Sequence, residues 1–378
     1  MRGPGSALHE QCRSRAGTGY SADAMLRFRA DAVRTMLRVA LALALFGVSS
    51  SARSEPSNLP TTAPVRFVIV GDTGSGGRGQ YAVATAIATV CAERGCQFAI
   101  GLGDNIYERG PSSVDDPQFQ SKFERPYAKL GFPFFMVLGN HDQSGLLPGS
   151  GVHPERGDYE VEYTKRSKKW IMPHRYYRFG VPFASATHLA AQSARPILEF
   201  FALDTNHLAP QHTPMHGWYR PGQAYDLAQR KWLREGLSAS RASWKIVVAH
   251  HPYRNNGKHR DAGEFIGFGA ARGRALKQMY EEEICGKADL LLSGHDHSLQ
   301  WLMSEPACGA RPQFVISGAG ATSYAYTPAP GPSGAYFQAF GSLGFFWATG
   351  TADSLTLAAY TVDANGTPMR AFEKTLRK

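Results

Sequence analysis

The sequence of 378 residues lacks several features that would define a class of protein at once. No apolar run approaches the roughly 20 residues that a membrane-spanning helix needs. Lys and Arg form no dense block, which argues against a nucleic-acid track. There is no internal repeat and no extended low-complexity tract, so nothing in the composition indicates extensive disorder. What remains is a globular chain whose 43% hydrophobic residues can bury a full core.

Cysteine is also scarce, with five in the chain. Cys12 falls in a segment that we expect to be removed, which leaves Cys91, Cys96, Cys285 and Cys308. An even number of cysteines in an exported chain predicts two disulfides. Of the three connectivities, pairing of neighbours along the chain is the simplest: Cys91 with Cys96, and Cys285 with Cys308. A zinc knuckle is the alternative, although no spacing is Cys-x-x-Cys.

Residues 1–52 have the pattern of an export signal. A charged segment, Met36-Leu37-Arg38, precedes the apolar residues 39–48 and the small residues 49–52. Met25 and Met36 are alternative starts, which would make the residues before them a spurious extension. We therefore expect an exported protein, periplasmic or secreted, with no stable membrane insertion after the signal is removed.

Residues 53–64 contain three prolines and are predicted to be a linker, and residues 65–378 are predicted to form a single catalytic domain. The formal charge is +10, and it falls to +6 once residues 1–52 are set aside. A mildly basic surface steers small anionic substrates rather than DNA. We expect small phosphorylated substrates, no nucleic acid, and a monomer.

Alternation of apolar runs with amphipathic segments predicts an α/β fold. Between residues 143 and 196 this alternation of apolar and amphipathic segments becomes irregular. The basic segment Lys165–Lys169 within it is expected to be a solvated loop. Strands are predicted at 65–70, 98–102, 133–138, 197–203, 245–249, 288–292, 314–317, 343–350 and 354–361, and helices at 80–93, 226–237 and 270–284.

Polar side chains follow these strands where each one ends: Asp72, Asp104, Asn140, His250, His295 and His297. The ends of such strands converge at one edge of an α/β sheet. Carboxylates gathered there would repel one another, and two metal ions would relieve the repulsion. Oxygen and imidazole ligands suit iron, zinc or manganese, and the lack of thiolate argues against copper(I). Each residue alone could serve as a turn, a cap or a solvated edge.

The motifs form an ordered set: Gly71-Asp72-x-Gly74, Gly103-Asp104-x-x-Tyr107, Gly139-Asn140-His141-Asp142, Val247-x-x-His250 and Gly294-His295-x-His297. This set resembles the five motifs of purple acid phosphatases, within the calcineurin-like metallophosphoesterases, and is most similar to the tartrate-resistant, mammalian-type branch. The resemblance implies a four-layer α/β/β/α sandwich with two mixed sheets. It also implies an acid phosphatase acting on phosphomonoesters.

The resemblance further implies a metal-ligand set. Asp72, Tyr107 and His297 would hold the first ion, Asn140, His250 and His295 the second, with Asp104 bridging both. Many relatives carry a histidine where this chain has Gly74, and Tyr107 would replace that ligand. A phenol with a pKa of about 10 is easily ionised only by a strongly Lewis-acidic ion, which favours Fe(III) at the first position. The second ion would be divalent iron, zinc or manganese.

Two further histidines have implied catalytic roles. His141 would contact the phosphate, with Asp142 orienting it, while a water activated between the two ions attacks phosphorus. His259 would protonate the leaving alkoxide, although residues 253–258 depart from the family pattern. His251 has no matched role and is expected to be structural.

Three other functions compete with this hypothesis. The glycines of Gly74-x-Gly76-x-x-Gly79 formally match a dinucleotide-binding fingerprint between a strand and a helix. A metal- or phosphate-binding protein with a decayed site would keep the fold without the catalysis. A phosphodiesterase or nucleotidase would use the same site on a different ester.

Overall fold

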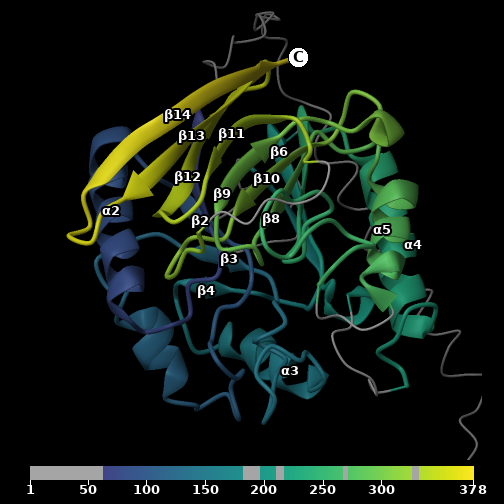
Figure 1. Ribbon diagram of the computed structural model, residues 1–378, viewed down its shortest axis with the longest axis horizontal. Helices are drawn as coiled ribbons and strands as arrows, with labels where there is room; N and C mark the ends of the chain where they lie inside the picture. Colours follow the sequence, from purple (N-terminus) through teal and green to yellow (C-terminus); the bar gives the residue numbers. More distant parts are fainter. Residues whose placement is uncertain (1–62, 182–195, 210–216, 267–270, 326–331) are drawn as a thin grey trace, which may run out of the picture. The chain divides into compact units, whose positions relative to one another are not determined.

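The structure is a computed structural model that describes residues 63–181, 196–209, 217–266, 271–325 and 332–378 (Figure 1). The expected export signal and most of the expected linker lie outside the described residues. Within the described ranges, no helix has the length and apolar character that crossing a bilayer requires.

The first of two seven-stranded mixed sheets has the order β14-β13-β12-β1-β2-β3-β4. β1 to β4 run parallel to one another, whereas β12, β13 and β14 extend the sheet beyond β1 by antiparallel pairing. The strands are β1 (Val65–Val70), β2 (Phe98–Gly101), β3 (Phe134–Met136), β4 (Trp170–Ile171), β12 (Leu343–Gly350), β13 (Ser354–Val362) and β14 (Pro368–Arg377).

The second sheet has the order β11-β9-β10-β8-β7-β6-β5 and is also mixed. Its centre, β6, β7, β8 and β10, is parallel, and antiparallel strands flank it on both sides. The strands are β5 (Tyr177–Val181), β6 (Leu198–Ala202), β7 (Trp244–Val248), β8 (Leu290–Ser293), β9 (Leu299–Leu302), β10 (Gln313–Ser317) and β11 (Ala335–Ala339).

The two sheets pack face to face through aromatic side chains. Phe67 of β1 meets Phe200 of β6 edge-on at 5.4 Å between ring centroids. Phe135 of β3 stacks on Phe179 of β5 at 3.9 Å. Side chains alternate across each strand, so a strand buried on both faces is apolar throughout. This explains why the central strands appear in the sequence as unbroken apolar runs.

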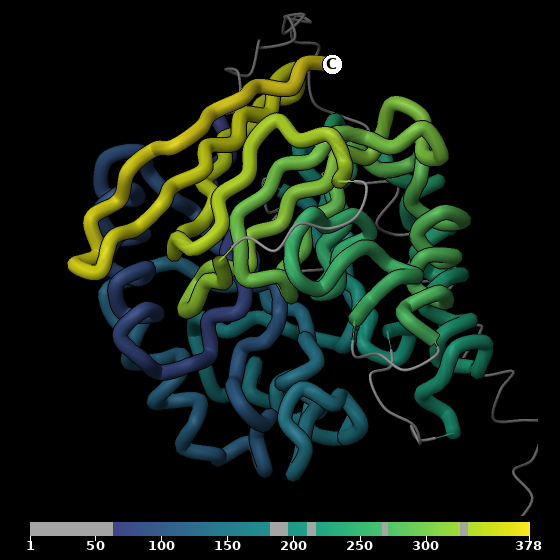
Figure 2. The backbone as a smooth tube through the Cα atoms, viewed as in Figure 1, coloured from purple at the N-terminus to yellow at the C-terminus, as the bar shows by residue number. Residues whose placement is uncertain are grey.

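Helices cover the two outer faces, as Figures 1 and 2 show. α2 (Arg78–Arg94) lies against the first sheet, and α4 (Ala224–Ala239) and α5 (Arg274–Glu283) lie against the second. Neighbouring side chains of β7 point to opposite faces of the second sheet. Ile246 belongs to the core between the sheets, and Val247 belongs to the core under α4 and α5. The predicted four-layer α/β/β/α sandwich with two mixed sheets is therefore confirmed.

The described residues between 143 and 181 contain more regular structure than their sequence pattern indicates. They include α3 (Pro154–Tyr163), β4 and β5. Short helical turns occur at η1 (Gln120–Glu124), η2 (Asn206–Leu208) and η4 (Pro306–Cys308). The helix predicted from residue 270 begins only at Arg274, after Gly273 in a left-handed conformation (φ 74°).

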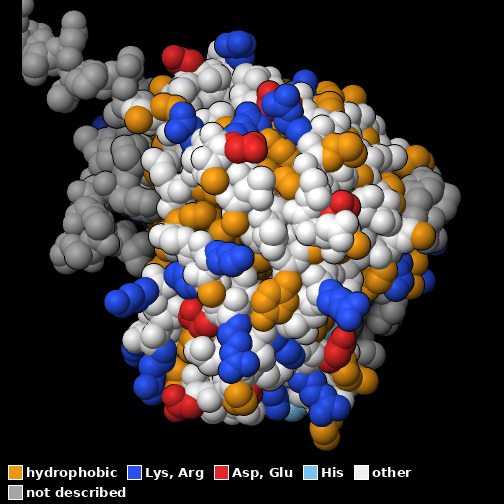
Figure 3. Space-filling view, turned by 90° about the vertical axis from the view of Figure 1, so that its left-hand side faces the viewer, with side chains coloured by type: hydrophobic (Ala, Val, Ile, Leu, Met, Phe, Trp, Pro, Cys, Tyr) orange, Lys and Arg blue, Asp and Glu red, His pale blue; other side chains and the backbone are white. Residues whose placement is uncertain are grey.

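Both predicted disulfides are present. Cys91 bonds to Cys96 at the end of α2, and Cys285 bonds to Cys308. These bonds use all four cysteines downstream of the expected signal, so the zinc knuckle is wrong. Basic side chains are spread between acidic and apolar ones on the face that Figure 3 shows, in keeping with the mildly basic charge.

Candidate metal centre

The candidate ligands stand at the carboxyl ends of the parallel strands, where both sheets meet. Asp72 and Asp104 follow β1 and β2, and His295 follows β8. All three have left-handed backbones, with φ of 58°, 51° and 68°. A left-handed backbone conformation at a residue other than glycine raises the free energy of the folded state by about 1 kcal/mol or more. Each of these ligands therefore occupies an uncommon backbone conformation just past the end of its strand.

One group of ligand atoms converges on the hydroxyl of Tyr107. Its Oη lies 3.0 Å from Asp72 Oδ1, 2.9 Å from Asp104 Oδ2 and 3.0 Å from His297 Nε2. His297 Nδ1 lies 2.6 Å from Thr322 Oγ1, which leaves Nε2 facing the group. The sequence motif therefore brings Tyr107 to the side chains with which it was predicted to share an ion.

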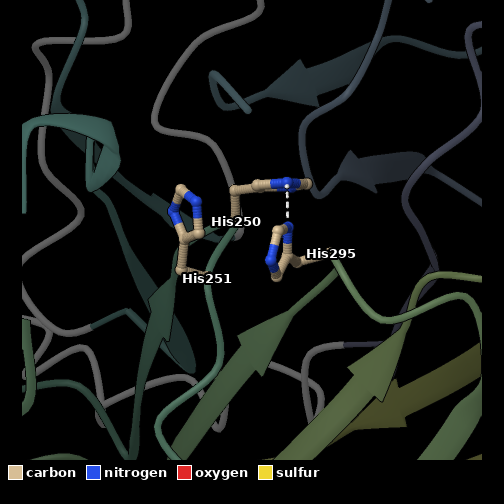
Figure 4. A group of neighbouring side chains, drawn as sticks. All are labelled: His250, His251 and His295. Atoms are coloured by element: carbon tan, nitrogen blue, oxygen red, sulfur yellow. Dashed lines mark hydrogen bonds between the residues drawn. The ribbon is translucent and has the colours of Figure 1, made fainter. Parts of the chain in front are cut away.

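A second group forms around His250. Its Nε2 lies 3.0 Å from Asn140 Oδ1 and 3.2 Å from His295 Nδ1, and a dashed line in Figure 4 marks the contact between the two imidazoles. His250 Nδ1 lies 2.8 Å from the carbonyl of Leu102, which can only accept a hydrogen bond. That contact fixes the tautomer, so Nε2 is the atom available to a metal.

Asp104 connects the two groups. Its Oδ2 is the oxygen that contacts Tyr107, whereas its Oδ1 lies 3.4 Å from His250 Nε2. The backbone amide of His141 also donates to Oδ1, at 2.8 Å. One carboxylate with an oxygen turned to each group is the geometry that a bridging ligand requires. The structure thus gathers all seven predicted ligand residues at one place.

Burial makes this cluster costly without a cation. All seven side chains have exposed fractions of 9% or less. Burial, together with Asp104 and Asp72, raises the pKa of Tyr107 well above its ordinary value. Burial and the neighbouring histidines lower the pKa of His295 well below the ordinary value for a histidine. Oxygen and imidazole donors from Asp72, Asp104 and His250 lie within 4.8 Å of one another, so the residues fit a metal ion.

His141 lies beside the first group, with its ring 4.4 Å from that of Tyr107. The ring is held by the backbone carbonyl of Glu108, 2.9 Å from Nδ1. The expectation that Asp142 orients this ring is wrong. The Asp142 carboxylate instead accepts backbone N–H groups from Asn105, Ile106 and Gly139, which ties the loop after β2 to the loop after β3.

His259 lies on the side of the second group, with its ring 4.3 Å from the ring of His295. Its backbone amide donates to Asp296 Oδ2 at 3.1 Å. Burial lowers the pKa of His259 to about 4, although Asp296 opposes the shift. The predicted general acid therefore lies at the predicted centre, although the segment before it departs from the family pattern.

Sequence reasoning missed two residues that support the ligands. The ring of Tyr324 stacks on His297 with centroids 4.4 Å apart and an interplanar angle of 8°. Buried Glu160 accepts from Asn105, at 3.0 Å, behind Asp104. Neither residue belongs to a strand-end motif, and their proximity comes only from tertiary packing. His251, assigned no role, is buried with Nδ1 2.9 Å from Thr205 Oγ1.

The glycines of the apparent dinucleotide fingerprint have a packing role instead. A β-carbon on Gly74 would lie 2.0 Å from the carbonyl oxygen of Asn105, beside Asp104. A β-carbon on Gly79 would lie 2.1 Å from the carbonyl oxygen of Ala321. These glycines let the loop after β1 and the start of α2 approach neighbouring backbone, which accounts for them without a nucleotide.

We therefore expect Gly74→Ala to destabilise the fold by about 3 kcal/mol, because the clash is with backbone that cannot move aside. Urea unfolding measures this loss. Gly131→Ala is the matched control, since a β-carbon there meets no atom within 4 Å. Equal stability of the two variants would contradict the close approach.

Comparison with known proteins agrees with this fold and site. Residues 65–299, more than half of the chain, match the calcineurin-like phosphoesterase family. The chain therefore belongs to that family.

Named relatives refine the assignment. The chain is 30% identical over 277 residues to tartrate-resistant acid phosphatase type 5 of Rattus norvegicus, covering 68% of this chain and 74% of that protein. It is 29% identical over 269 residues to purple acid phosphatase 4 of Arabidopsis thaliana, covering 69% of each. Within the family it is thus a purple acid phosphatase, a metal-dependent phosphatase.

Solved structures share the fold. One is GAP50, described as the anchor in the inner membrane complex of Plasmodium, with a TM-score of 0.63 and 18% identity. The similarity covers 83% of this chain and 89% of that one. At this identity the likeness concerns the architecture alone.

Proposed function

We propose that the protein is an exported acid phosphatase that hydrolyses phosphomonoesters at a centre of two metal ions, Fe(III) and a divalent ion. Asp72, Tyr107 and His297 would hold Fe(III). Asn140, His250 and His295 would hold divalent iron, zinc or manganese, and Asp104 would bridge. The observation that carries the proposal is the contact of Tyr107 Oη with Asp72, Asp104 and His297. Two disulfides support export, since such bonds persist in oxidising compartments.

The ions would supply a hydroxide at low pH and neutralise charge on the phosphate. The chain's own residues would position the ester and move the proton. His141 Nδ1 faces a carbonyl oxygen, so it carries a proton, and in the imidazolium form Nε2–H can donate to a phosphate oxygen. His259, beside His295, would give a proton to the leaving oxygen. We propose that the substrates are small phosphorylated molecules and that the protein acts as a monomer.

A visible absorption spectrum tests the first metal position. Protein loaded with iron should be coloured, because a ferric ion bound to a phenolate absorbs visible light. Tyr107→Phe should lose this band while keeping its fold by circular dichroism. Tyr81→Phe is the control, since Tyr81 lies exposed on α2.

Metal analysis and an ester assay test the remaining parts. Two ions per chain and hydrolysis of para-nitrophenyl phosphate at acidic pH are expected. A colourless protein with a single bound ion would contradict the proposal. Cleavage of phosphodiesters alone would also contradict it. Binding of NAD without metal would favour the dinucleotide alternative instead.

A further inference from the structure

Lys258 lies beside the candidate metal centre. It directly precedes His259, whose ring lies 4.3 Å from that of His295. If His259 protonates the leaving oxygen, the group attached to that oxygen lies near the loop that carries His259 and Lys258. Lys258 is exposed on this loop, whereas His259 is half-buried.

The Lys258 ammonium lies over an aromatic ring that itself belongs to the site. Its Nζ is 4.3 Å from the ring centroid of Tyr324. That ring stacks on His297 with centroids 4.4 Å apart, and the amide of Tyr324 donates to the carbonyl of His297 at 3.0 Å. Tyr324 therefore connects the ammonium to the ligands of the first ion.

The charge of Lys258 is available to a ligand. Another cation of this loop, Arg254, contacts the carboxylates of Asp261 and Glu305. In the part of the chain that the structure describes, Lys258 has no carboxylate within 4.0 Å. A cation–π contact at an exposed site contributes only about 0.5–1 kcal/mol, so the ammonium keeps most of its capacity to bind an anion.

The loop holds the base of this side chain in place. The amide of Asn256 donates to Gln300 Oε1 at 2.9 Å, and the amide of Asn255 donates to Asp261 Oδ1 at 2.7 Å. A β-carbon on Gly257 would lie 2.2 Å from Asp296 Oδ1, so this loop packs tightly over the residue between the two histidine ligands. The long side chain of Lys258 thus starts from a fixed backbone beside the metal centre.

We propose that Lys258, supported by the ring of Tyr324, binds a second negative charge on the leaving group of the substrate. The preferred substrates are then phosphomonoesters whose alcohol or phenol carries an anionic group. This inference rests on the proposed function, because it assigns a substrate class to the same site.

Two aryl esters of similar shape test the inference. Para-carboxyphenyl phosphate carries the second charge, and para-carbamoylphenyl phosphate replaces it with a neutral amide. We expect the wild-type protein to prefer the carboxylate by about two- to five-fold in kcat/KM, the range expected of an exposed ion pair. Lys258→Gln should remove the preference through KM, and Lys258→Arg should retain it. High salt should weaken it in the wild type.

Lys231→Gln is the matched control, because Lys231 is an exposed lysine on α4. It should leave the preference unchanged. An equal response of both esters to Lys258→Gln, or no preference in the wild type, would overturn this inference alone. Failure of the metal-loaded wild type to hydrolyse either ester would overturn the proposed function as well.

Discussion

Asp104→Asn should lower phosphatase activity by about a thousand-fold, the largest loss we expect from a single isosteric change. The carboxylate turns one oxygen to Tyr107 and the other to His250, so an amide removes the charge that two ions would share. Two cations that stabilise phosphoryl transfer contribute several kcal/mol, and each 1.36 kcal/mol is ten-fold in rate. Hydrolysis of para-nitrophenyl phosphate and metal content by elemental analysis measure the effect.

Asp115→Asn provides the comparison, since Asp115 is an exposed carboxylate outside the site. It should retain full activity and both ions. If Asp104→Asn kept two ions and near-normal activity, Asp104 would not be a bridging ligand.

His259→Ala should distinguish substrates by their leaving groups. Alkyl phosphates need a proton on the departing oxygen and should slow by about 100-fold, whereas para-nitrophenyl phosphate should slow by only a few-fold. Burial lowers the pKa of His259 to about 4, so its protonated fraction falls as pH rises above that value. Alkyl ester hydrolysis by the wild type should therefore decline with rising pH, and the variant should lack this decline.

His174→Ala is the control for this experiment, because His174 is an exposed histidine that is not among the candidate ligands or catalytic residues. Steady-state rates on both esters across acidic pH are the measurement. Equal losses on alkyl and aryl esters would remove His259 from the general-acid role.

The buried strands, and the residues at which they end, could be predicted from the sequence. β1, β7 and β12 lie where apolar runs indicate them, because a strand buried on both faces needs apolar side chains throughout. The ligands follow from the same logic, since parallel strands end at one edge. Tyr107 follows no strand end directly, and its assignment came from the resemblance of the motif Gly103-Asp104-x-x-Tyr107 to that of a known family.

Other parts of the structure left no such pattern. β14 alternates half-buried and exposed side chains at an edge of its sheet, and β4 has only two residues. The stacking of Tyr324 on His297 and the role of Asp142 depend on loops that meet only in the folded chain. No local propensity encodes such contacts.

The ligands come from both halves of the sandwich, and this has a thermodynamic consequence. Tyr107 and Asn140 follow strands of one sheet, while His250 and His297 follow strands of the other. A metal ion that takes ligands from both sheets binds only when the two sheets are packed together. Metal binding and the packing of the sheets are therefore linked equilibria. The two metal ions would then stabilise the packing of one sheet against the other. Removing them with a chelator would loosen the interface between the sheets and also abolish activity.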